Sequence, residues 1–115
     1  MKMSKANSSL DPITLEIIFN ALRSVADETF ITLMKSAYST NIKERRDHST
    51  AIMDKYGRLI VQADASLPVH LASMGGLMVS LLKKYKGNIF PGDIFIGNDP
   101  HVAGGTHLPD INMAM

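Results

Sequence analysis

Two histidines and two aspartates lie in one glycine-rich stretch near the end of the sequence, at Asp99, His101, His107 and Asp110. The last two are separated only by Leu108-Pro109, and the proline ring restricts the backbone of both spacer residues. Imidazole and carboxylate groups together suit zinc, manganese or iron(II). The spacing therefore predicts a metal site built on His107 and Asp110, although a motif this short also fits a loop that holds no metal.

A catalytic metal site needs more groups than this pair supplies. Such sites typically take about three protein ligands and leave one position open, and the sequence ends at Met115, five residues after Asp110. We therefore expect the missing groups to come from elsewhere, with the chain as part of a larger assembly. The preceding Gly104-Gly105-Thr106 offers backbone N–H groups and a hydroxyl that could bind a substrate oxygen beside the metal. No Gly-Lys-Ser/Thr sequence follows, so nucleotide binding by this loop is not expected.

A second group of polar residues lies in the charged run 39–49, which leads into a predicted β-hairpin. Apolar stretches at 50–53 and 59–61 flank a turn-forming segment, as expected for two antiparallel strands. Asp47 and His48 lie just ahead of the first strand, so their side chains should point to opposite faces. One of them could enter a cleft while the other meets the core or solvent. A solvated loop with local ion pairs is the alternative interpretation.

Two amphipathic helices are predicted to frame these segments. Asp11-Pro12 is typical of a helix start, and apolar residues recur at three- and four-residue intervals from about Pro12 to Tyr38. A second helix is predicted from about Ala72 to Lys86, with Gly75-Gly76 in its first turn, where another backbone or an anion could approach. His70, just ahead of that helix, is either a metal ligand or a hydrogen-bonded structural residue.

The predicted fold class is α+β. The order is a long N-terminal helix, a β-hairpin, a second helix, and a strand at 94–96 that leads to the glycine-rich loop. The chain of 115 residues is long enough for one core, with 45% hydrophobic and 20% charged residues. Sheet order beyond the hairpin does not follow from these patterns.

Composition limits the partners and the compartment. Twelve Lys and Arg residues against eleven Asp and Glu residues leave a net charge of +1, which gives no reason to expect nucleic acid or a charged membrane as partner. The sequence contains no cysteine, so disulfides and thiolate zinc sites are excluded. It has neither a signal peptide nor the run of about 20 apolar residues that spans a membrane. We therefore expect a cytoplasmic protein.

Four ordered motifs resemble the N-terminal part of the hydantoinase B/oxoprolinase family. They are residues 11–18, the Arg45-Arg46-Asp47-His48-Ser49 run, residues 68–74, and the segment from Gly92-Asp93 to Asp110. Family members are much longer, so the resemblance implies a truncated or partial chain. Residues 1–10 would be a flexible N-terminus, and residues 11–115 the N-terminal part of a larger mixed α/β domain.

The resemblance implies an ATP-dependent hydrolase of cyclic amides, of the hydantoinase or 5-oxoprolinase type, that opens a lactam or hydantoin ring with a metal-bound water. A hydantoinase A-like subunit or domain would use the ATP, the two would form a heteromeric complex, and the isolated chain could be inactive. One alternative is a subunit of an ATP-dependent carboxylase of the acetone carboxylase type. The other alternative is a fragment without catalytic activity that serves only in assembly, with the long N-terminal helix as its docking face.

The resemblance also implies a set of metal ligands. In the carboxylase relatives a His-x-x-Asp pair and a later His bind the metal, which here corresponds to His107 and Asp110, with the later His beyond Met115. Asp47, in the charged motif, would be a further ligand. His101 departs from the family, in which an aromatic residue is more usual, and is not counted as a ligand. No catalytic residue is assigned beyond this set.

Overall fold

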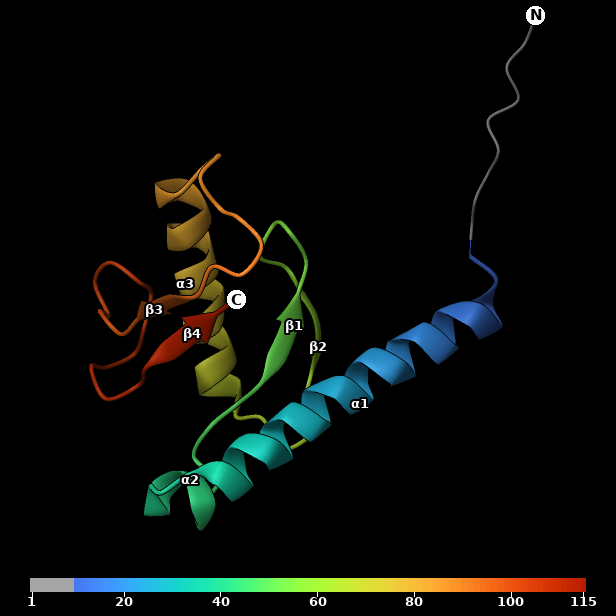
Figure 1. The fold of residues 1–115 in the computed structure, drawn as a ribbon, viewed down its shortest axis with the longest axis horizontal. Coiled ribbons are helices and arrows are strands. Elements are labelled where there is room, and N and C mark those ends of the chain that lie inside the picture. Colours follow the sequence, from blue (N-terminus) through green and yellow to red (C-terminus); the bar gives the residue numbers. More distant parts are fainter. Residues whose placement is uncertain (1–9) are drawn as a thin grey trace, which may run out of the picture.

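The computed structural model describes residues 10–115, so the predicted flexible N-terminus lies outside the described residues except for Leu10. Figure 1 shows a long helix on one side and two small hairpins that flank a second long helix. This arrangement confirms the predicted α+β class. The elements, in chain order, are α1 (Pro12–Ser36), α2 (Thr40–Lys43), β1 (Ala51–Met53), β2 (Leu59–Gln62), α3 (Pro68–Lys84), β3 (Phe95–Gly97) and β4 (Asn112–Ala114).

Helix α1 begins as its sequence predicts. The Asp11 carboxylate accepts a hydrogen bond from the Thr14 backbone N–H at 3.1 Å, and Pro12 occupies the first helical turn. The helix ends at Ser36, two residues before the predicted Tyr38, because Ala37 adopts an extended backbone with φ −69° and ψ 144°. Boundary differences of this size are ordinary at frayed helix ends.

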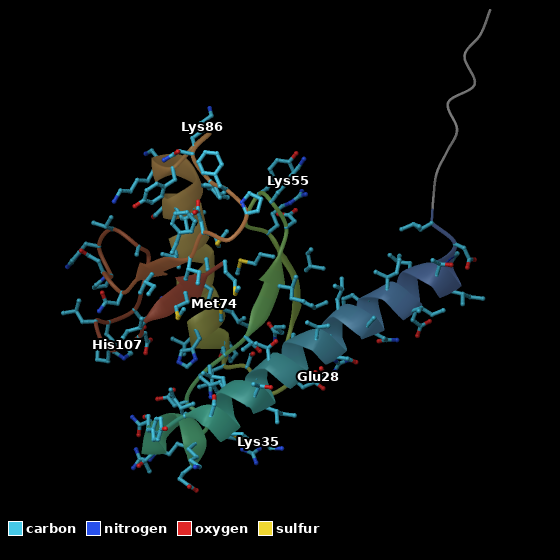
Figure 2. The ribbon with its side chains drawn as sticks, viewed as in Figure 1. Glu28, Lys35, Lys55, Met74, Lys86 and His107 are labelled. Carbon is cyan, nitrogen blue, oxygen red and sulfur yellow. The ribbon has the colours of Figure 1, made fainter. Side chains whose placement is uncertain are left out.

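Only a small part of α1 is buried. Ala26 and Phe30 are its buried residues, and they pack with Val61 and Ala63 in the main core. The N-terminal end of the helix projects away from the other elements (Figures 1 and 2). Apolar residues remain exposed along it, namely Ile13, Leu15, Ile17, Ile18, Phe19 and Val25. An apolar surface of this extent is typical of a face that another polypeptide covers.

The charged run contains one helical turn, α2, and then leads into the predicted hairpin. Strands β1 and β2 pair antiparallel, with Ala51 opposite Gln62, and a bulge shifts the register between Ile52 and Met53. In the turn between them Gly57 has φ +78°, and a Cβ there would lie 2.9 Å from Met78 Cβ on α3. The predicted hairpin and the special role of its glycine are confirmed, and the turn is packed directly against α3.

Asp54 organises this hairpin turn and makes it sensitive to acid. Its carboxylate accepts hydrogen bonds from the backbone N–H groups of Tyr56 and Arg58 and from Arg58 Nε, and the Arg58 backbone bond is the main cause of the lowered pKa of Asp54. A lowered pKa in the folded state stabilises the fold above the ordinary value of 3.8, and this contribution is lost as the pH falls through the lower folded value.

We therefore expect the melting temperature of the wild-type chain to fall more steeply between about pH 5 and pH 2 than that of Asp54→Asn. The asparagine can still accept the backbone hydrogen bonds but cannot be protonated in this range. Melting curves of both proteins at several pH values measure the difference. Parallel pH profiles would contradict the role given to the Asp54 carboxylate.

Helix α3 differs from the prediction at its start. It begins at Pro68, four residues before the predicted Ala72, because the proline can occupy the first turn and Leu67 before it is extended, with ψ 132°. Its last helical residue is Lys84, against the predicted Lys86. His70 consequently lies inside the first turn, and Gly75-Gly76 lies in the middle of the helix. The predicted position of the glycine pair in the first turn is wrong, and with it the possibility of an anion bound there.

The last strand of the described chain was not predicted. Strand β3, which the sequence predicts, pairs antiparallel with β4, with Phe95 opposite Ala114 and Gly97 opposite Asn112. A Cβ at Gly97 would lie 2.9 Å from Leu77 Cδ1, so β3 lies close against α3. Within residues 10–115, no helix combines the length and the apolar character needed to cross a membrane.

Candidate functional site

His107 and Asp110 are brought together on the loop between β3 and β4. His107 Nε2 lies 3.4 Å from Asp110 Oδ1. Two ligands that are each about 2.1 Å from a tetrahedral zinc ion are about 3.4 Å from one another. The donor pair therefore fits one divalent ion in its spacing, while the role of both residues as ligands stays a prediction.

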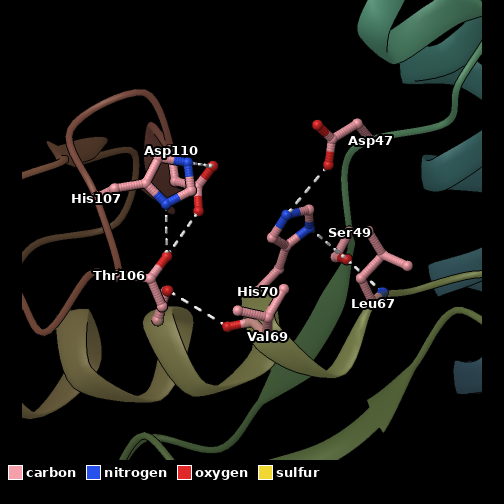
Figure 3. A network of polar contacts seen from close by, with 9 residues as sticks. Asp47, Ser49, Leu67, Val69, His70, Thr106, His107 and Asp110 are labelled. Carbon is pink, nitrogen blue, oxygen red and sulfur yellow. Dashed lines mark hydrogen bonds and ion pairs between the residues drawn. The ribbon is translucent and has the colours of Figure 1, made fainter.

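Thr106 determines which nitrogen of His107 is free. Its hydroxyl donates a hydrogen bond to Asp110 Oδ2 at 3.0 Å and also lies 3.0 Å from His107 Nδ1. A hydroxyl has a single proton, and here Asp110 receives it, so Nδ1 must act as the donor to Thr106. The proton of the neutral ring is then on Nδ1, and Nε2, which lies beside Asp110 (Figure 3), keeps its lone pair. This tautomer is the one that a metal ligand coordinating through Nε2 requires.

The spacer between the two residues is also held in place. The side-chain amide of Asn98 donates a hydrogen bond to the Leu108 carbonyl at 2.8 Å, which connects the end of β3 to the segment between His107 and Asp110. Asp99 Oδ1 accepts hydrogen bonds from the backbone N–H groups of His101 and Val102, at 2.8 and 3.1 Å. These contacts form a turn on which His101 is exposed.

The glycine-rich loop is fixed by a backbone contact with α3. Gly104 has φ +68°, and a Cβ added to it would lie 2.5 Å from Gly76 Cα. The sequence predicts that another backbone or an anion approaches Gly75-Gly76, and in the structure the backbone of Gly104 lies there. The substrate-binding role of Gly104, Gly105 and Thr106 stays a prediction, and two of these residues already have structural contacts, Gly104 with α3 and Thr106 with the His107–Asp110 pair.

Asp47 lies on the segment between α2 and β1 and faces a different histidine. Its Oδ1 is 3.4 Å from His70 Nε2, while the side chain stays 49% exposed. In the described part of the chain, no three His, Asp or Glu side chains converge closely enough to enclose a metal ion. Asp47 is therefore not grouped with His107 and Asp110, although Figure 3 shows both pairs on the same side of α3.

His48 is a structural residue. It is only 7% exposed, its ring stacks on Phe30 with centroids 3.8 Å apart, and its Nε2 lies 3.0 Å from the Phe30 carbonyl oxygen. The predicted opposite orientation of Asp47 and His48 is thus found, with His48 in the core and Asp47 facing outward. Residues 43–47 are exposed, as expected for a solvated loop, whereas His48 is buried.

Sequence reasoning left Ser49 without a role and left that of His70 open. Ser49 Oγ lies 3.0 Å from His70 Nδ1 and accepts a hydrogen bond from the Leu67 backbone N–H at 2.8 Å. The two residues are 21 positions apart, so no periodic pattern links them. Their presence in two separate motifs of the family resemblance was the available signal.

A family model described as hydantoinase B/oxoprolinase matches residues 11–115. A 5-oxoprolinase from Saccharomyces cerevisiae is 41% identical over 104 residues, which cover 90% of this chain and 8% of the relative. An uncharacterised protein from Methanocaldococcus jannaschii is 46% identical over 107 residues, 90% of this chain and 19% of its own length. The caprolactamase subunit beta from Pseudomonas jessenii is 31% identical over 106 residues, 92% of this chain and 18% of the relative.

The chain therefore spans between 8% and 19% of the length of these relatives. No solved structure resembles it significantly.

Proposed function

Because the chain belongs to the hydantoinase B/oxoprolinase family, we propose that it forms the N-terminal part of an ATP-dependent hydrolase that opens a lactam or hydantoin ring. Relatives named 5-oxoprolinase and caprolactamase subunit beta support this class, since 5-oxoproline and caprolactam are both cyclic amides. The observation that carries the proposal is the His107–Asp110 pair, with the spacing and the histidine tautomer suited to one divalent ion.

In this proposal His107 and Asp110 would hold zinc, manganese or iron(II), and the two facing atoms are Nε2 and Oδ1. The bound ion would lower the pKa of a water molecule toward neutrality and so supply a nucleophile. Thr106 keeps the imidazole and the carboxylate in register with one another through its two contacts. Asp47 would be a further ligand, and a later histidine from the remainder of the family domain would complete the set.

ATP is needed because an unactivated amide carbonyl is a poor electrophile. A hydantoinase A-like subunit or domain would phosphorylate the substrate and pass the activated ring to this part of the enzyme. The name of the caprolactamase subunit beta supports a multisubunit arrangement in at least one relative. Backbone N–H groups of Gly104 and Gly105 would stabilise the negative charge that develops on the carbonyl oxygen.

We propose that the reaction takes place in the cytoplasm.

We propose that the remainder of the family domain binds to the exposed apolar surfaces of this chain. The chain covers 18% of the caprolactamase subunit beta, so most of that relative has no counterpart in residues 1–115. Apolar side chains are exposed along α1 and on the β3–β4 hairpin, where Ile96 and Met113 lie opposite one another. A bound polypeptide would remove these side chains from water, which is favourable. Assembly is therefore part of the proposed function.

The test is turnover by this chain combined with the rest of the family domain and a hydantoinase A-like partner. We expect 5-oxoproline, hydantoin or caprolactam to be opened only when ATP is present, with ATP consumed in proportion to the product. Product can be measured by chromatography and released phosphate by a coupled assay. Ring opening without ATP, or ATP hydrolysis without ring opening in the presence of all three substrates, would contradict the proposal.

A further inference from the structure

His70 lies between two polar side chains, and the proposed function gives it no role. It lies in the first turn of α3, and only 13% of its side chain is exposed. Each ring nitrogen faces one polar group, with Ser49 Oγ 3.0 Å from Nδ1 and Asp47 Oδ1 3.4 Å from Nε2 (Figure 3). A nearly buried imidazole between a hydroxyl and a carboxylate has its proton position set by these neighbours.

The proton of the neutral His70 ring can be assigned from Ser49. Ser49 Oγ accepts the backbone N–H of Leu67 at 2.8 Å, which leaves its own proton for donation, and its other partner in the described part of the chain is His70 Nδ1. Nδ1 therefore accepts and Nε2 carries the proton.

The two histidines thus have opposite tautomers. His107 presents an Nε2 lone pair beside Asp110, whereas His70 presents an Nε2–H group to Asp47. An Nε2 atom that carries a proton has no lone pair for a metal, so His70 is a donor and not a ligand in this arrangement. The distance of 3.4 Å exceeds that of an ordinary hydrogen bond, so the contact orients the carboxylate mainly by electrostatic attraction.

We propose that His70 is a positioning residue that directs the Asp47 carboxylate for metal binding. Ser49 fixes the ring of His70, and the Leu67 N–H bond ties Ser49 to the start of α3, so Asp47 is oriented by a chain of contacts that begins at the backbone. The inference rests on the proposed function, because it treats Asp47 as a ligand. It adds a residue that controls how well that ligand binds, as hydrogen-bonding partners of metal ligands commonly do.

The first experiment measures the tautomer directly. Nitrogen-15 NMR of the metal-free protein at alkaline pH, where imidazoles are neutral, distinguishes a proton on Nδ1 from one on Nε2. We expect the Nε2–H form for His70 and the Nδ1–H form for His107. The Nδ1–H form for His70 would overturn the inference, because the ring would then present a lone pair to Asp47 and could itself be a ligand.

The second experiment measures zinc affinity by competitive titration of the protein together with the subunits that accompany it. We expect His70→Ala to weaken zinc binding about 10- to 100-fold. His70→Gln should stay within a few-fold of wild type, since its amide N–H extends about as far as Nε2, whereas His70→Asn, with a shorter side chain, should resemble His70→Ala. His101→Ala is the matched control on an exposed histidine. A purely structural role of His70 would not distinguish glutamine from asparagine in this way.

The outcomes separate this inference from the proposed function. If the wild-type protein takes up no zinc, manganese or iron, the proposed function fails and the inference fails with it. If the wild type binds zinc and His70→Ala binds it with unchanged affinity, only the inference fails. If His70→Ala does not fold, the comparison of His70→Gln with His70→Asn gives the same decision.

Discussion

The natively purified protein, with the subunits that accompany it, is expected to contain nearly stoichiometric zinc, manganese or iron, and His107→Ala is expected to lose it. The reason is the geometry of the pair, in which His107 Nε2 and Asp110 Oδ1 lie 3.4 Å apart, and the contact of Thr106 with Nδ1, which favours a free lone pair on Nε2. Loss of a hydrogen-bonding partner of a metal ligand typically lowers metal affinity about 10- to 100-fold, and loss of the ligand itself should lower the affinity further. Elemental analysis of both proteins measures the metal content.

Asp110→Asn should behave similarly, because a neutral amide oxygen binds a divalent cation more weakly than a carboxylate does. We expect turnover of the assembled enzyme to fall by at least about 100-fold in both variants, in proportion to the lost metal. His101→Ala is the matched control, since His101 lies exposed in the same loop and only its backbone N–H is bonded, to Asp99. Metal that persists in His107→Ala, or turnover that is unchanged in Asp110→Asn, would show that the pair is not the metal site.

The sequence predicted correctly those structural elements that depend on neighbouring residues in the chain. Asp11 and Pro12 start α1, and Gly57 is required by the turn of the first hairpin, so both were predicted correctly. Strand β4 was missed because three residues paired with a strand 17 positions away leave no periodic pattern. The start of α3 was misplaced because Pro68 suits a first helical turn but is equally common in extended segments.

In the candidate site, too, a contact between sequence neighbours was predicted and a contact between distant segments was not. His107 and Asp110 are three residues apart, so their spacing predicted that they would meet, as they do. The contact of Ser49 with His70 joins residues 21 positions apart, and it depends on how the segment before β1 lies against the start of α3. Thr106 was expected to line the substrate, and only the structure revealed its bonds to both members of the pair.

The second large effect is expected at the contact between α3 and the glycine-rich loop. A Cβ at Gly76 would lie 2.7 Å from Gly104 Cα and 2.9 Å from the Gly104 carbonyl oxygen, both backbone atoms that cannot rotate away. We expect Gly76→Ala to lower the free energy of unfolding by about 1–3 kcal/mol. Gly104→Ala should cost about 1–2 kcal/mol more, because φ +68° is also unfavourable for alanine.

Gly75→Ala provides the matched control in the same helix. A Cβ there meets no atom within 4 Å, so the substitution should raise the free energy of unfolding by about 0.5–1 kcal/mol through the better helix propensity of alanine. Urea unfolding of the three variants measures both the size and the sign of the effects. Equal changes for Gly75→Ala and Gly76→Ala would contradict the close backbone contact.

The same contact should also affect metal binding at the proposed His107–Asp110 site. Gly104 lies two residues before Thr106, so a loop pushed away from α3 would disturb the bonds that hold His107 and Asp110 in register. We therefore expect Gly76→Ala to weaken zinc binding although it removes no ligand, and Gly75→Ala to leave it unchanged. Such a result would show that the contact between Gly76 and Gly104 affects metal affinity, although neither glycine is a proposed ligand.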